Sequence, residues 1–158
     1  MNLLKEELVK SNYKHVKSYI NSGNILLISD ENKNILKSNI QKIINTHFGF
    51  SVEMIIKTKS EIDEILKKNP YNPNTETDNS KKIVVMLSDK IEISRFDIFK
   101  AEGKVTENYY IFDDLLYIYY HDGAGKSKFT NQYIESRLKL ISTARNWNTI
   151  QKMSEMME

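Results

Sequence analysis

The chain has 158 residues, a formal net charge of +2 and no cysteine. A chain of this length buries roughly 70% of its unfolded surface and needs no crosslink to fold, and the lack of cysteine excludes disulfides, thiolate metal sites and a cysteine nucleophile. The charge is too small for a general attraction to nucleic acid or anionic lipid, so any anion binding must be local.

The apolar segments argue against export and against insertion into a membrane. Residues 1–7 mix acids, bases and apolar side chains, whereas a secretory signal has a basic stretch followed by an uninterrupted apolar one. No segment approaches the roughly 18 consecutive apolar residues of a membrane span, and the densest apolar run, 115–120, is half tyrosine. We therefore expect a cytoplasmic protein with no membrane partner.

The first half of the sequence predicts helices and strands in alternation. Apolar residues recur at helical spacing in two segments, and two β-rich runs flank a turn that contains Gly23. Asp30 is expected to cap the second helix, and Gly49 to end it. The expected order is a helix from Leu3 to about Ser11, strands over 16–20 and 24–28, a helix up to Gly49, and a strand over 52–57.

The second half follows a segment that is typical of a linker. A short helix that begins at Ser60 ends before Pro70, and residues 70–81 contain both prolines of the chain together with many Asn and Thr residues. The expected elements after this segment are a strand over 82–87, a helix over 93–101, a hairpin of 108–112 with 115–120, a helix over 130–138, an extended piece over 140–143 and a helix over 148–157.

This order of elements predicts an α+β fold with antiparallel sheets and a C-terminal helix. The second half reads strand, helix, strand, strand, helix, strand, which is the split βαβ or ferredoxin-like order, and the first half repeats it without the opening strand. We expect two ferredoxin-like half-domains, 1–69 and 82–158, joined by the linker 70–81. Since the opening strand of such a sheet lies centrally, the first sheet is incomplete, and its edge could pair with a second copy to form a homodimer.

Three motifs together resemble a known family. They are Tyr-Ile-Asn-Ser-Gly-Asn at 19–24, Gly-Ala-Gly-Lys-Ser-Lys at 123–128 with Thr-Asn at 130–131, and Thr-Ala-Arg-Asn-Trp-Asn-Thr at 143–149. In order and spacing they are similar to the bacterial domain-of-unknown-function family DUF 1697. The resemblance implies a pair of ferredoxin-like repeats that usually begin with a further strand and a glycine-containing loop upstream of Met1, so that Met1 would be a truncated or reassigned start. It supplies no catalytic residues.

The glycine-rich motif at 123–128 is a candidate anion site. A nucleoside triphosphatase P-loop needs a glycine five positions before Gly125, where this chain has Tyr120. A weaker form remains, in which Gly123 and Gly125 allow a concave run of amides beside Lys126, Ser127 and Lys128, just before a helix N-terminus. The alternative is a plain connection from hairpin to helix in which the glycines only satisfy the backbone conformation.

The segment Arg145-Asn146-Trp147 offers a second set of ligand-binding groups. A guanidinium, an amide and an indole can together form hydrogen bonds and stack on a ligand. The alternative is structural: Trp147 anchors the last helix to the core, Asn146 caps it, and Arg145 braces a loop. Both readings hold together if the segment lines a cleft with the loop at 123–128.

Catalytic and metal-binding signals are weak. His121 with Asp122 could act as an acid–base group, although a lone histidine at the end of a strand is more often structural. The three histidines are far apart and lack metal-ligand spacing, so we expect neither a metal nor a cofactor.

These observations favour a binding module for a phosphate-bearing ligand, a nucleotide or a nucleic acid, held between the loop at 123–128 and the Arg145 segment. One alternative is an enzyme for a phosphorylated small molecule, in which Lys126 and Arg145 neutralise charge and His121 or Asp122 moves a proton. The other is a protein-interaction or assembly domain that uses the incomplete sheet edge.

Overall fold

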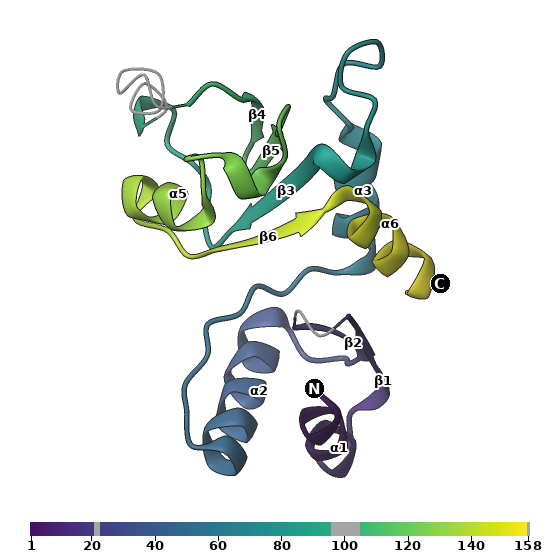
Figure 1. Cartoon of the computed structure of the whole chain (residues 1–158). Helices are drawn as coiled ribbons and strands as arrows, with labels where there is room; N and C mark the ends of the chain where they lie inside the picture. The colour runs from purple at the N-terminus through teal and green to yellow at the C-terminus, as the bar shows by residue number, and fades with distance from the viewer. Residues whose placement is uncertain (21–22, 96–104, 158) are drawn as a thin grey trace. The chain divides into compact units, whose positions relative to one another are not determined.

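The computed structural model describes residues 1–20, 23–95 and 105–157. The chain forms two compact units, one of residues Met1–Ile56 with Met156–Glu158 and one of residues Lys57–Glu155 (Figure 1). Each unit combines helices with an antiparallel sheet, as the α+β prediction requires. No helix among the described residues has the length and apolar character needed to cross a bilayer.

The first unit pairs two helices with a two-stranded sheet. Its elements are α1 (Asn2–Lys10), β1 (Lys14–Tyr19), β2 (Asn24–Ile28) and α2 (Lys33–Phe48). The predicted helices and hairpin are therefore confirmed, and the Asn21-Ser22 part of the turn lies outside the described residues. The core of this unit is a cluster of apolar side chains from both helices and β1, namely Leu8, Val16, Leu36, Ile40 and Ile44.

The cap of α2 differs from the prediction. Asn32, and not Asp30, is the N-cap, and its side chain accepts a 3.0 Å hydrogen bond from the Ile35 N–H. The helix begins only at Lys33, which leaves Asp30 too far upstream to reach the first turn. Gly49 ends the helix with φ +74°, a left-handed conformation that glycine adopts without a steric penalty.

The predicted strand over 52–57 is not formed. Val52, Met54 and Ile56 do pack against the core of the first unit, with the two-residue period of an extended chain. However, β1 and β2 pair only with each other, and residues 51–58 belong to no sheet. In the ferredoxin-like order the last strand lies beside the opening strand, so without that neighbour the segment has an extended backbone but no ladder partner.

The second unit has a complete four-stranded sheet in the order β4-β5-β3-β6. The split βαβ prediction accounts for this order, because β3, the first strand of the unit, lies between β5 and β6. The helices and strands are α3 (Lys59–Lys68), β3 (Lys82–Leu87), β4 (Asn108–Phe112), β5 (Leu115–Tyr119), α5 (Asn131–Leu138), β6 (Ser142–Asn146) and α6 (Trp147–Met156), with short 3-10 helices η1 (Asn79–Lys81), η2 (Ile93–Arg95) and η3 (Ala124–Lys126).

Two predicted elements of the second unit differ in extent from the described structure. The sequence predicts an extended piece over 140–143, whereas β6 starts at Ser142 and continues through Arg145 and Asn146 as a full partner of β3. The predicted helix over 93–101 lies mostly outside the described residues, and only the 3-10 turn η2 at its start is described.

One face of the four-stranded sheet packs against α5. The side chains that form this core alternate along β3 and β5 and meet the helix and the segment before it, and they are Val85, Leu87, Leu116, Ile118, Tyr120, Phe129, Ile134 and Leu138. All are buried, and Thr130 caps α5 by accepting a hydrogen bond from the Tyr133 N–H. Ala144 of β6 belongs to the same face.

Tyr71 covers the opposite face of the sheet. Its hydroxyl donates to the carbonyl oxygens of Ile83 at 2.9 Å and Ile118 at 3.3 Å, and the side chain is only 5% exposed. Its ring makes edge-to-face contacts with four aromatic side chains, namely Tyr110, Tyr117, Tyr119 and Trp147, the last at a centroid distance of 5.5 Å. Burial raises the pKa of this phenol, which therefore remains a hydrogen-bond donor.

Glu76 binds the segment 70–81, which also contains Tyr71, to the edge strand β4. Although it is a carboxylate, its side chain is 0% exposed, and it accepts hydrogen bonds from Asn108 Nδ2 at 2.8 Å, the Tyr110 hydroxyl at 2.9 Å and the Asn72 N–H at 2.6 Å. These donors provide the pairing that a buried acid requires. Residues 70–81 thus pack on the second unit, and the division between the units falls after Ile56, before the segment that the sequence predicts as a linker.

Helices α3 and α6 are joined on this unit by polar contacts of Ser154 with Asp63 and Lys59. Asp63 accepts a 2.6 Å hydrogen bond from the Ser154 hydroxyl and bonds at 2.7 Å from Lys59 Nζ. The hydrogen bond from Lys59, more than any other contact, lowers the pKa of this carboxyl. Tyr117 adds a contact between sheet and helix by donating to the Ile65 carbonyl at 3.1 Å.

Replacing Tyr71 should destabilise the second unit more than any single surface change. Tyr71→Ala leaves a cavity among the aromatic rings and should lower the free energy of unfolding by about 3–5 kcal/mol, whereas Tyr71→Phe loses only the hydroxyl bonds and should cost about 1 kcal/mol. Urea unfolding followed by the fluorescence of Trp147, the single tryptophan of the chain, measures both changes. Phe112→Ala, at a ring that is 40% exposed, is the control, and a Tyr71→Ala loss no larger than that of the control would contradict the packing described.

Candidate functional site

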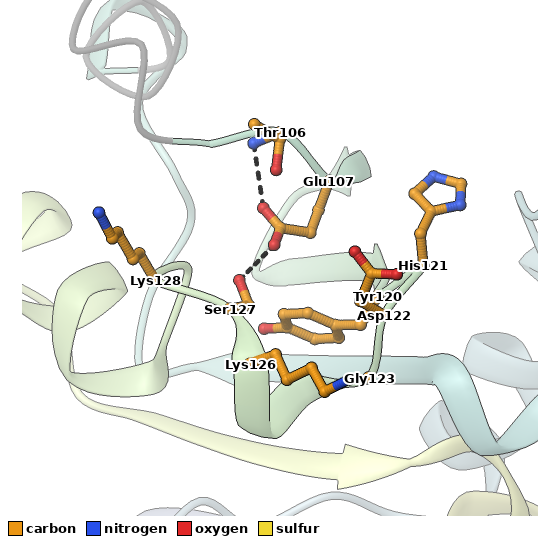
Figure 2. Close-up of a pocket in the computed structure, with 9 residues that line it drawn as sticks. All are labelled: Thr106, Glu107, Tyr120, His121, Asp122, Gly123, Lys126, Ser127 and Lys128. Carbon is orange, nitrogen blue, oxygen red and sulfur yellow. Dashed lines mark hydrogen bonds between the residues drawn. The ribbon is translucent and has the colours of Figure 1, made fainter.

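A pocket of about 420 Å³ lies on the second unit where β5 leads into α5. Its walls come from the segment before β4, from the end of β5 and from the glycine-rich loop, and the lining residues are Thr106, Glu107, Tyr120, His121, Asp122, Gly123, Lys126, Ser127 and Lys128 (Figure 2). Six of the predicted site residues are therefore gathered here: His121, Asp122, Gly123, Lys126, Ser127 and Lys128. Gly125 lies in η3 and does not line the pocket.

The loop is shaped by its own backbone bonds. Gly123 has φ +88°, which a residue with a side chain adopts only with strain, and its N–H donates to the Tyr120 carbonyl at 3.0 Å. The N–H groups of Lys126 and Ser127 donate to the carbonyls of Gly123 and Ala124. These three amides are used within the loop and do not contribute to the predicted concave run of amides.

Ser127 and Glu107 form the polar centre of the pocket wall. The Ser127 hydroxyl donates to Glu107 Oε1 and accepts a 2.9 Å bond from the Phe129 N–H, while Glu107 Oε2 accepts a 3.1 Å bond from the Thr106 N–H. Figure 2 shows the bonds that join Glu107 to Ser127 and to Thr106. The carboxylate is held in place from both oxygens, and each oxygen retains a further lone pair for a ligand.

The charged side chains around this centre carry both signs. Lys126, Lys128 and Asp122 are exposed, and Figure 2 shows Lys126 running beside Gly123 while Lys128 extends away from Glu107. This mixture allows a ligand to meet a cation and a carboxylate in one pocket. It contains no excess of positive charge that would draw in a polyanion.

His121 is held by its backbone and ring. Its carbonyl accepts a 2.7 Å bond from Lys81 Nζ, and its ring makes an edge contact with Tyr119 at 5.1 Å. In Figure 2 the imidazole points away from the Ser127–Glu107 pair. Among the residues that the structure describes, no three His, Asp or Glu side chains gather closely enough to hold a metal ion.

Arg145 lies on the other face of the sheet, so the single cleft predicted from the sequence is not formed. Arg145 pairs with Val84, and since neighbouring side chains of a strand alternate, it faces away from the Ala144 and Val85 side that carries α5 and Tyr120. Its guanidinium donates to Thr143 Oγ1 at 2.6 Å and to the Ala144 carbonyl at 2.8 Å. Burial lowers the pKa of Arg145.

Asn146 and Trp147 have structural contacts of the kind that the sequence allows as an alternative. Asn146 Nδ2 donates to the Ser80 carbonyl at 2.9 Å, and its Oδ1 accepts from the Asn148 N–H at 2.9 Å, so the side chain ties η1 to the start of α6. Trp147 is 4% exposed and packs on Tyr71. Neither residue lines the pocket.

Sequence reasoning misses three pocket residues, Thr106, Tyr120 and Glu107, and of these Glu107 is the charged one. No motif surrounds it, and it precedes Ser127 by 20 positions. The hairpin register supplies a signal, because Asn108 pairs with Tyr119, and one further step places Glu107 opposite Tyr120 at the start of the glycine-rich loop. A prediction of register, and not only of strands, would have brought Glu107 to this loop.

Comparison with known proteins identifies a family but no activity. The family described as "Protein of unknown function (DUF1697)" matches residues 1–117. The conserved bacterial protein SP0830 from Streptococcus pneumoniae has a similar structure, with a TM-score of 0.72 and 21% sequence identity over 100% of this chain and 88% of that chain. No curated protein matches the sequence. The chain belongs to the DUF1697 family of proteins of unknown function.

Proposed function

We propose that the chain is a binding module that holds a phosphate-bearing ligand in the pocket at residues 121–128. The observation that carries the proposal is the gathering of Lys126 and Lys128 with the Gly123 turn around one cavity of about 420 Å³. This volume falls in the usual range of small-molecule sites, roughly 300–1,000 Å³. The ammonium groups would neutralise the phosphate, because the amides of Gly123, Lys126 and Ser127 are used in the loop itself.

Binding is favoured over catalysis by the contacts of His121. An enzyme that moves a proton needs its acid or base within hydrogen-bond reach of the ligand. The His121 ring is packed edge-on against Tyr119, with a centroid distance of 5.1 Å. Arg145, which the sequence-based hypothesis assigns to the same ligand, is on the other face of the sheet and has no part in this proposal.

Replacing both pocket lysines should weaken phosphate binding. For Lys126→Ala combined with Lys128→Ala, we expect the affinity for AMP or ribose 5-phosphate to fall by about tenfold or more, since a hydrogen bond to a charged group contributes about 1.5–3 kcal/mol. Titration calorimetry at low salt measures the change, and binding to the unaltered chain should weaken as salt rises. Lys67→Ala, at an exposed lysine of α3, is the matched control. Unchanged affinity in a folded double variant would remove the basis of the proposal.

A second candidate function, assembly through a sheet edge, rests on the first unit alone. There β2 is paired with β1 only, and the extended residues 52–57 have no ladder partner among the described residues. Open backbone edges of this kind pair with strands of other chains. Ile28, at the end of β2, is 58% exposed and offers apolar surface for such a contact.

A charge at the edge of β2 should reduce assembly of the chain. If β2 pairs with a second copy, light scattering should detect a dimer whose fraction rises with protein concentration, and Ile28→Lys should shift this equilibrium toward the monomer. Ile35→Lys is the control, because Ile35 is 50% exposed but lies on α2. A chain that stays monomeric at every concentration tested would exclude this mode of assembly.

A further inference from the structure

We propose, on the basis of the function proposed above, that the ligand is a phosphorylated sugar, either free or as part of a mononucleotide, and not a nucleic-acid strand. The inference comes from the acidic side chains of the pocket. A site that binds only an anion would have no need of them. Glu107 and Asp122 line the same cavity as Lys126 and Lys128, so carboxylates and ammonium groups are equal in number around it.

The carboxylates disfavour a polyanion. A nucleic-acid strand is held by a groove of uniform positive charge that follows its backbone, and it gains affinity by releasing counterions at several phosphates. Beside the Lys126 ammonium, such a strand would bring its next phosphates toward Glu107 or Asp122, where like charges repel. A ligand with one phosphate group can place that group at a lysine and avoid the acids.

The same carboxylates suit sugar hydroxyls. An ionised carboxylate accepts hydrogen bonds only, and acids that accept bonds from ribose hydroxyls are a recurrent feature of nucleotide sites. Glu107 is oriented for this role by the Ser127 hydroxyl and the Thr106 N–H, which occupy one lone pair on each oxygen. Asp122 is exposed and lines the same pocket as Glu107. A sugar phosphate therefore finds acceptors and a cation within one cavity.

The experiment compares four probes on the full chain: inorganic phosphate, ribose 5-phosphate, AMP and a single-stranded oligonucleotide. We expect ribose 5-phosphate or AMP to bind at least tenfold more tightly than inorganic phosphate or the oligonucleotide. Preference for AMP over ribose 5-phosphate identifies the mononucleotide, and equal affinities identify the free sugar phosphate as sufficient. An oligonucleotide that binds as tightly as either would overturn the inference.

Single substitutions measure separately how the pocket acid and the pocket lysine contribute to affinity. Asp122→Asn should lower the affinity for ribose 5-phosphate about tenfold and leave that for inorganic phosphate unchanged or stronger, while Lys126→Ala should weaken both. Because Glu107 also supports the loop, Asp122 is the primary test, and Glu64→Gln at an exposed acid of α3 is its control. If Lys126→Ala weakens binding but Asp122→Asn has no effect on any probe, the inference fails and the proposed function stands. If Lys126→Ala has no effect alone or combined with Lys128→Ala, the proposed function itself fails.

Discussion

The contact of Tyr71 with the sheet organises the second unit. A single ring meets four other aromatic side chains, and its hydroxyl bonds to carbonyls of the two central strands, β3 and β5. Glu76 then ties the same segment to β4 with three hydrogen bonds. In this way a segment rich in polar residues covers part of one face of the sheet. Helix α3 contacts the same face, because its Ile65 carbonyl accepts a hydrogen bond from Tyr117.

This closure determines where a ligand could bind on the unit. With Tyr71 and Trp147 packed on one face and α5 on the other, the end of the sheet remains, where β5 passes into the loop at 121–128. The loop is held by its own contacts, since Gly123 permits the turn and Ser127 is bonded to Glu107 and to Phe129. The groups that project from it, Lys126 and Asp122, carry opposite charges. A loop that is held in this way and carries mixed charges is suited to a small ligand that has both an anionic and a hydroxylated part.

The sequence predicts an element of the fold wherever a segment has the right periodicity of apolar residues and also has a neighbouring strand or helix to pair or pack with. Strands β3, β4 and β5 and helices α1, α2, α3 and α5 follow from periodicity and turn residues. The strand over 52–57 was wrongly predicted because its alternation is real but its neighbour is absent from the sheet. The segment 70–81 has the composition of a linker, and only the long-range bonds of Tyr71 and Glu76 assign it to the second unit. For the candidate site, the sequence predicts the loop at 123–128. It does not predict on which side of the sheet Arg145 lies or that Glu107 lies near the loop, because both depend on the register of strand pairing.

The attachment of residues 70–81 to the sheet can be tested by hydrogen exchange at one amide. The Glu76 N–H donates to the Asn72 carbonyl at 2.8 Å beneath a fully buried carboxylate, so it should open only when the segment leaves the sheet. Exchange followed by NMR should therefore be slowed at Glu76 to within about tenfold of the Val85 amide in the central strand β3. Exchange at Glu76 as fast as in an unstructured peptide would show that the segment is a flexible linker, and the architecture described here would be wrong.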